Sequence, residues 1–155
     1  YTPSVKIIEC RTEAASKEVA MALKIKEGQD VIVCVKAFFA DDKLCSIVQD
    51  YVDIELLPDY EDMTTEDMDS LFYYIYHKTG HTIQWDKTEI QVIYSKEIPE
   101  IHHIVKNYGG DDKSYLLLKG VNYDERDRET LYALEYVDTD LIKFNQIRKK
   151  VITYS

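Results

Sequence analysis

Apolar residues change their spacing several times along the chain, and each change marks the boundary of a predicted element. Alternating or β-favouring runs predict strands at residues 5–10, 31–39, 44–54, 82–94, 114–123 and 129–137. Apolar residues at helical spacing predict helices between a Thr12 cap and Gly28, over residues 66–79, and from Pro99 to Lys106. The tail from Leu141 is predicted as either a last strand or a short amphipathic element.

The order helix, glycine, aspartate, strand, turn, strand occurs twice. The first copy covers residues 18–53 and the second covers residues 100–138, and the alignment matches Lys36 with Lys119. Such a duplication suggests two pseudo-equivalent helix-hairpin halves that share one antiparallel sheet. The sequence therefore predicts an α+β fold with helices packed on the sheet, and it disfavours a parallel nucleotide-binding sheet.

Composition narrows the class of protein. The 155 residues fit one domain, and the 45% hydrophobic content suffices for a core. A formal net charge of -10 argues against nucleic-acid binding by this chain itself, because phosphate contacts need clustered Lys and Arg. No apolar run is long enough for a membrane span, and Tyr1-Thr2-Pro3-Ser4 does not begin a signal peptide, so we expect a cytoplasmic location.

The three cysteines, Cys10, Cys34 and Cys45, are an odd number at irregular spacing. They are predicted to be buried free thiols in a reducing compartment. No C-x-x-C or H-E-x-x-H spacing occurs, so we expect neither a metal site nor a cofactor.

Four segments together resemble the UTRA domain, the ligand-sensing module of GntR-type bacterial transcriptional regulators of the HutC subgroup. Residues 20–31 are similar to the family pattern A-x-x-L-x-(I/V)-x-x-G-x-x-V, and residues 41–52 resemble its first hairpin. Ser70-Leu71-Phe72 and the later segment 123–144 resemble two further family patterns. The resemblance implies a fold like that of chorismate lyase, and it covers about 140 residues of the chain.

What the resemblance implies is a sensor. In the family, an N-terminal winged helix-turn-helix domain binds operator DNA, whereas the UTRA domain binds a small metabolite and supports a homodimer. We therefore expect residues 1–155 to be the effector-binding and dimerisation domain, with the DNA-binding domain outside this chain. Two alternatives stay open: an assembly module without a physiological ligand, and an enzyme of the chorismate-lyase type.

The resemblance also implies ligand-binding positions. Two family arginines at alternate positions of a strand match Lys36 and Phe38, and an acidic position on the partner strand matches Val48. The family serine is retained as Ser70, and the family tyrosine that follows Ser-Leu matches Phe72, which keeps the ring and loses the hydroxyl.

Late in the chain, the acid and the aromatic residue that close the family pocket match Leu131 and Val137. Most polar anchors of sugar-phosphate-binding members are thus absent. This favours a more apolar effector, or a pocket that has no physiological ligand.

Strand alternation leads independently to one of these residues. It places Lys36 on an otherwise apolar face, and it makes Glu135 the only acid on one face of the last predicted strand. A buried ammonium needs a partner. Three interpretations remain open: an ion pair of Lys36 with Glu135 or Asp50, a Lys36 side chain that extends to water, or contact of Lys36 with a ligand anion.

The central helix carries a dense group of aromatic residues. Its tyrosines are predicted to pack in the core or at an interface, or to stack on a ligand, and Phe72 and Tyr76 are the expected inward pair because they are spaced i,i+4.

Overall fold

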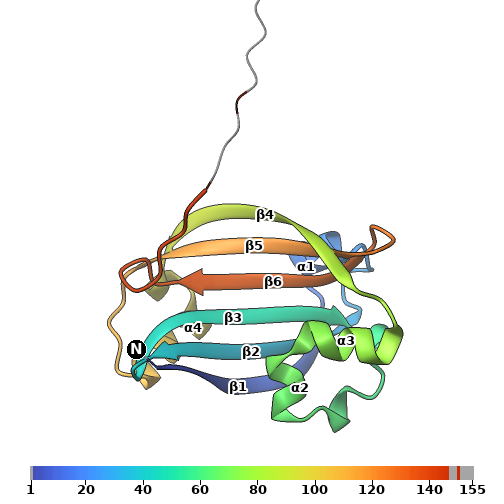
Figure 1. The fold of residues 1–155 in the computed structure, drawn as a ribbon, viewed down its shortest axis with the longest axis horizontal. Helices are drawn as coiled ribbons and strands as arrows, with labels where there is room; N and C mark the ends of the chain where they lie inside the picture. Colours follow the sequence, from blue (N-terminus) through green and yellow to red (C-terminus); the bar gives the residue numbers. More distant parts are fainter. Residues whose placement is uncertain (1, 147–149, 151–155) are drawn as a thin grey trace, which may run out of the picture.

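The computed structural model describes residues 2–146 and residue 150. Six strands form one sheet, and four α-helices lie beside it (Figure 1). The elements follow in the order β1 (Pro3–Ala14), α1 (Lys17–Leu23), β2 (Asp30–Ala40), β3 (Lys43–Asp53), α2 (Thr65–Asp69), α3 (Leu71–Thr79), β4 (Ile83–Tyr94), α4 (Pro99–Asn107), β5 (Ser114–Asp124) and β6 (Glu129–Val137).

The sheet confirms the predicted duplication and extends it. Its strand order is β1-β2-β3-β6-β5-β4, and every neighbouring pair is antiparallel. The first half contributes β1, β2 and β3, and the second half contributes β4, β5 and β6 in mirrored order. Each half is therefore strand, helix, strand, strand, and the two halves meet where β3 pairs with β6. The predicted α+β class with an antiparallel sheet is confirmed.

The match of Lys36 with Lys119 is wrong at the level of the sheet face. Lys36 is the seventh residue of β2, whereas Lys119 is the sixth residue of β5. Successive side chains of a strand point to opposite faces, so an offset of one residue exchanges the faces. Lys119 Nζ accordingly lies 2.7 Å from Glu18 of α1, on the face opposite to that of Lys36.

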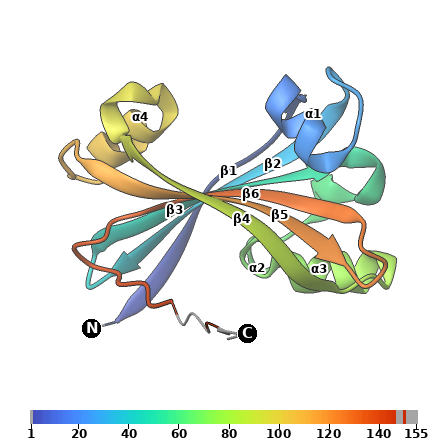
Figure 2. The same cartoon turned by 90° about the horizontal axis from the view of Figure 1, so that it is seen from above.

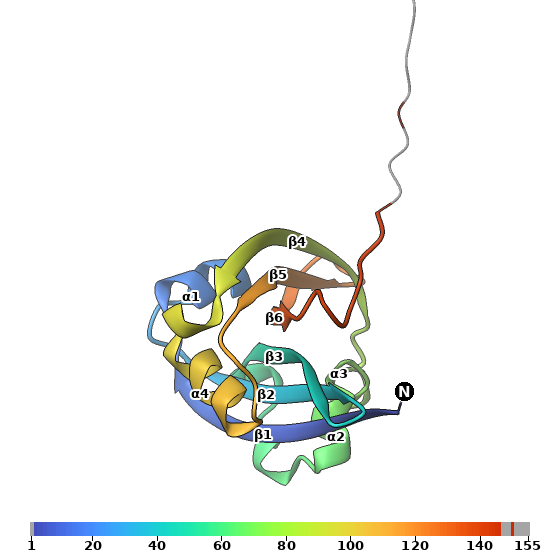
Figure 3. The same cartoon turned by 90° about the vertical axis from the view of Figure 1, so that its left-hand side faces the viewer.

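Helices cover both faces of the sheet, but unequally. Viewed from above, α1 and α4 lie on one side and α2 and α3 on the other (Figure 2). The α1 and α4 side encloses the larger buried cluster, which includes Val33, Val35 and Ile47. On the other side, α3 packs Leu71 and Ile75 on a smaller cluster at one end of the sheet. The end-on view shows how the sheet curves around this second face (Figure 3).

Two predicted helix boundaries differ from the structure. Thr12 does not cap a helix, because β1 continues to Ala14 through pairing of Thr12 with Ile32. The cap of α1 is Ser16, whose side chain accepts a hydrogen bond from the Val19 amide. The helix predicted over 66–79 is divided into α2 and α3 at Ser70, which leaves helical geometry with φ -111° and ψ 56°.

This division changes which aromatic residues face the core. Leu71, Tyr74 and Ile75 are the buried residues of α3. Phe72 and Tyr76 are 49% and 48% exposed, so the predicted inward pair of the central helix is wrong.

Residues 142–146 of the tail belong to neither a helix nor a strand, and residues 147–149 and 151–155 lie outside the described part. The predicted last element therefore has no counterpart in residues 142–146. None of the described helices has the length and apolar character that a membrane crossing needs.

Candidate functional site

A cavity of about 540 Å³ lies on the face of the sheet that carries α2 and α3. Five strands, β2 to β6, contribute to its floor, and the α2–α3 junction from Asp69 to Tyr73 forms one side. The break at Ser70 matters here, because it turns Ser70 and Phe72 toward the cavity while Leu71 and Ile75 fix α3 to the sheet.

The cavity gathers five of the eight candidate ligand-binding residues: Lys36, Val48, Ser70, Phe72 and Glu135. The register explains three of them, since Lys36 is opposite Val48 and Val48 is opposite Glu135. These side chains form a row across the centre of the sheet.

The other three candidates do not line this cavity. Leu131 is fully buried in the cluster beneath α3, and Val137 is fully buried at the end of β6. Phe38 lines a separate apolar groove with Val5 and Ile142.

Lys36 forms an ion pair with Asp50, one of the alternatives that the sequence left open. Lys36 Nζ lies 3.1 Å from Asp50 Oδ2, and the two side chains are only 8% and 7% exposed. Burial raises the pKa of Asp50, and the Lys36 ammonium opposes that rise. The cation of the cavity therefore already has a counterion from the next strand.

Glu135 has no such partner. In the part of the chain that the structure describes, its carboxylate makes no ion pair and no hydrogen bond. Its pKa is raised by burial and by the negative charge of Asp50. No fully buried side-chain oxygen among the described residues lacks a partner, so the Glu135 carboxylate is reached by solvent from the cavity.

Sequence reasoning missed much of the remaining lining. Across the sheet from Asp50 lie Ala133, Gly120 and Thr88, in consecutive register positions. Asn122 and Asp86 follow in the next row. Alternation alone could assign these residues to one face of each strand. Only the pairing of β3 with β6, which joins the two halves, brings them beside Asp50.

Two thiols lie beside the cavity floor. Cys10 and Cys34 are register partners on β1 and β2, and their Sγ atoms are 3.3 Å apart. Contact with Cys34 lowers the pKa of Cys10, while the same contact and burial raise the pKa of Cys34. All three cysteines of the chain are free.

Within the described residues, one cluster has atoms placed as metal ligands would be: His81, Asp124 and Glu125. His81 Nδ1 lies 2.7 Å from Glu125, and Arg128 Nη2 lies 3.0 Å from His81 Nε2. Arg128 also pairs with Asp124 at 3.2 Å. Arg128 thus contacts two members of the cluster, His81 and Asp124, and these contacts explain the grouping as a hydrogen-bond and ion-pair network.

Comparisons with known proteins agree on the fold. The effector domain of PhnF from Mycobacterium smegmatis superposes with a TM-score of 0.81 at 15% identity, over 96% of this chain and 88% of that one. A GntR-family transcriptional regulator from Enterococcus faecalis V583 gives 0.78 at 15% identity, over 94% and 100%. The longer PhnF structure gives 0.80 at 16% identity, over 96% of this chain and 63% of that one.

A search of curated proteins finds no match to this sequence. The family model described as the UTRA domain matches residues 1–143, which is nearly the whole sequence. This match identifies the chain as a member of the UTRA domain family.

Proposed function

We propose that this UTRA domain binds a small-molecule effector in the cavity beside Lys36 and Glu135, and that it links effector binding to DNA binding by a separate N-terminal domain. The observation that carries the proposal is the 540 Å³ cavity, whose lining combines ionisable, amide and aromatic side chains. The transcriptional-regulator neighbours support a regulatory role over an enzymatic one.

Regulation would follow from a population shift. An effector that binds one arrangement of the regulator better than another changes the proportions of the two, and hence the affinity for operator DNA. The longer PhnF chain, of which this domain covers 63%, supports the view that the DNA-binding part is a separate module. The acidic charge of the present chain agrees with this division. A HutC-type regulator of this kind would act in the cytoplasm.

The edge of the sheet supports the proposed homodimer. Among the described residues, β4 pairs only with β5, so its outer edge has backbone groups without a strand partner there. The strand exposes Ile90, Val92 and Tyr94 at 60%, 68% and 43%. Charged residues oppose edge-to-edge pairing. The opposite edge, β1, has them along its length, for example Lys6 and Arg11, whereas residues 90–94 of β4 have none. An antiparallel edge is complementary to its own copy, so we propose that β4 forms the dimer contact.

A thermal-shift screen tests the effector proposal. Sugars, sugar phosphates, amino acids, amines and organic acids are added to the wild-type domain and to Ala133→Leu, which projects a larger side chain over Gly120, its register partner. At least one compound should raise the wild-type Tm by several degrees and leave Ala133→Leu unchanged, because a ligand selective for the folded state stabilises it.

The matched control is Ala22→Leu, the same change at a half-buried alanine of α1 on the other side of the sheet. This variant should respond to the compound like the wild type. If no compound class stabilises the wild-type domain, the second candidate, an assembly module without a ligand, gains support from the apolar residues Phe38, Leu131 and Val137.

A further inference from the structure

The cavity contains one cation and an excess of carboxylates. Its ionisable lining residues are Lys36, Asp50, Asp69, Asp86 and Glu135. Lys36 and Asp50 neutralise each other at 3.1 Å, so three carboxylates have no compensating charge from the cavity lining. Of these three, Asp69 and Asp86 are exposed at the rim, whereas Glu135 is half-buried on the floor.

An anionic ligand would meet a specific obstacle. To reach the only cation of the lining, it would either draw Lys36 away from Asp50, whose side chain is 7% exposed, or share the ammonium and add a second negative charge beside that carboxylate. Within the described residues, Lys36 is the only ionic partner of Asp50. A buried carboxylate without its cation is strongly unfavourable, so the energy gained from a ligand anion would be largely cancelled.

A cationic ligand meets no such obstacle. The Glu135 carboxylate lies on the floor, next to Val48 on one side and Leu118 on the other, with no cation in contact among the described residues. A ligand ammonium at this position would leave the Lys36–Asp50 pair intact. Phe72 and Tyr73, at the side of the cavity, add aromatic faces, which also attract cations.

We propose that the effector of this domain is an organic cation, bound through an ammonium group that pairs with Glu135. This inference rests on the proposed effector function of the cavity and specifies the chemical class of its ligand. Hydroxyl or amide groups of the ligand would find Thr88 and Asn122 on the neighbouring strands. The whole cavity, of about 540 Å³, is large enough for a small metabolite.

Isothermal titration calorimetry with two probes of similar shape and opposite charge tests the proposal. The probes are 2-phenylethylammonium and 3-phenylpropionate, which share the ring and chain and differ in the sign of the end group. The ammonium should bind the wild-type domain at least tenfold more tightly than the carboxylate. Glu135→Gln, which keeps the shape and removes the charge, should abolish this preference.

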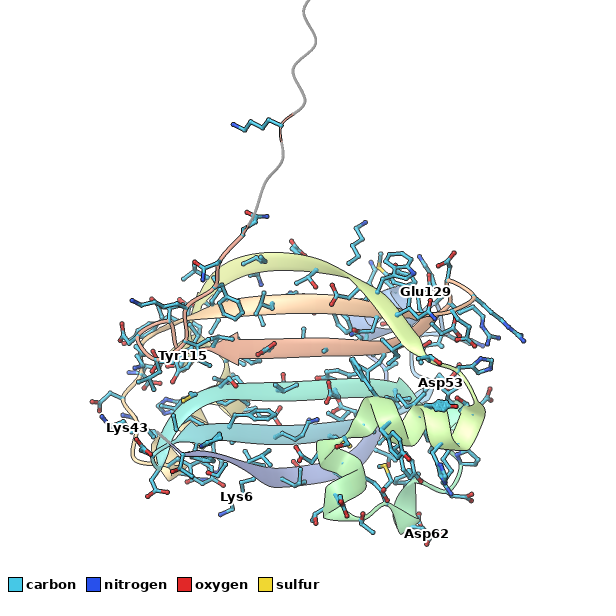
Figure 4. The ribbon with its side chains drawn as sticks, viewed as in Figure 1. Lys6, Lys43, Asp53, Asp62, Tyr115 and Glu129 are labelled. Atoms are coloured by element: carbon cyan, nitrogen blue, oxygen red, sulfur yellow. The ribbon has the colours of Figure 1, made fainter. Side chains whose placement is uncertain are left out.

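Two controls separate the site from the general acidity of the chain. Glu129→Gln changes a carboxylate on the same strand, but at the end of the sheet near Asp53 and outside the cavity lining (Figure 4). This variant should retain the full preference for the ammonium. Ala133→Leu should weaken binding of both probes, which shows that they enter the cavity.

The outcomes distinguish the two proposals. If the carboxylate probe binds equally well or better, or if Glu135→Gln keeps the preference, the cation assignment is overturned and the effector function stands. If the ammonium probe gives the same heat with the wild type and with Ala133→Leu, the cation assignment is overturned as well. If in addition no compound class stabilises the wild type in the thermal screen, the effector function falls with it.

Discussion

At the scale of single residues, the sequence predicts the sheet face on which a side chain lies better than the residue with which it pairs. Alternation places Lys36 and Glu135 on cavity-facing positions, and both lie there. It leaves open whether Lys36 pairs with Glu135 or Asp50, because this depends on the direction in which a long side chain extends over the sheet. The structure pairs Lys36 with Asp50 and leaves Glu135 to the cavity. Asp50 is therefore the structural partner of Lys36, and Glu135 is the acid for which we propose a ligand.

The Lys36–Asp50 pair should contribute to folding in a way that its removal reveals. Lys36→Ala leaves the Asp50 carboxylate buried without a cation, and we expect it to lower the free energy of unfolding by about 3–5 kcal/mol. Urea denaturation measures this value. The double variant Lys36→Met with Asp50→Leu should recover most of it, because an apolar pair replaces the ionic one. Equal stability of Lys36→Ala and the wild type would contradict the observed pair.

Glu135 should make stability depend on pH. Because burial and Asp50 raise its pKa above the ordinary 4.5, the folded state holds the proton more tightly than the unfolded state. Below the ordinary pKa, Glu135 is protonated in both states and does not lower the free energy of unfolding. As the pH rises from the ordinary pKa to the raised one, the free energy of unfolding falls. Glu135→Gln should have a higher Tm than the wild type at pH 7, with a smaller difference at pH 4. A difference that is the same at both pH values would refute the raised pKa.

At the scale of elements, helices α1 and α4 each have a glutamate that contacts the other half of the chain. Glu18 of α1 accepts hydrogen bonds from Lys119 of β5 and Tyr132 of β6. Glu100 of α4 accepts hydrogen bonds from Arg11 of β1 and Gln49 of β3. The aligned repeat matches these two glutamates, so it predicted an equivalence that recurs in the contacts. The repeat could not predict that each glutamate contacts the opposite half of the chain, because that arrangement depends on the pairing of β3 with β6.

Glu100→Ala should weaken this crossing contact. The Gln49 amide lies 2.8 Å from Glu100 and is 4% exposed as a residue, so loss of the acceptor leaves a buried donor without its partner. We expect a loss of about 1–3 kcal/mol in the free energy of unfolding. Chemical denaturation of Glu100→Ala and of the exposed control Glu97→Ala measures the difference. If the two variants lose the same amount, the contact contributes nothing.

At the scale of the whole molecule, the predictable part was the order and type of the elements. The six strands and the duplicated hairpins follow from residue patterns, and the antiparallel sheet follows from the duplication. Which strands become neighbours at the centre was not encoded in any local pattern. For that reason the face shared by Asp50, Ala133 and Gly120, and with it most of the cavity floor, became visible only in the assembled sheet.

The dimer proposal belongs to this scale. Val92→Lys places a charge on the exposed edge strand β4, and it should convert a wild-type dimer to monomer, because charged edges resist strand pairing. Met21→Lys, an equally exposed apolar residue on α1, should leave the dimer intact. Size-exclusion chromatography with light scattering measures the mass of each. A monomeric wild type, or a Val92→Lys dimer, would contradict the proposed edge.

The central claim is that the effector occupies the cavity at the junction of the two halves. Two-dimensional NMR of the isotopically labelled domain, titrated with the compound that raises Tm most, locates the binding site residue by residue. We expect the largest amide shifts at Val48, Asp50, Ala133 and Glu135, and we expect these shifts to vanish in Ala133→Leu. Shifts centred on the groove around Phe38, or shifts that Ala133→Leu leaves unchanged, would contradict it.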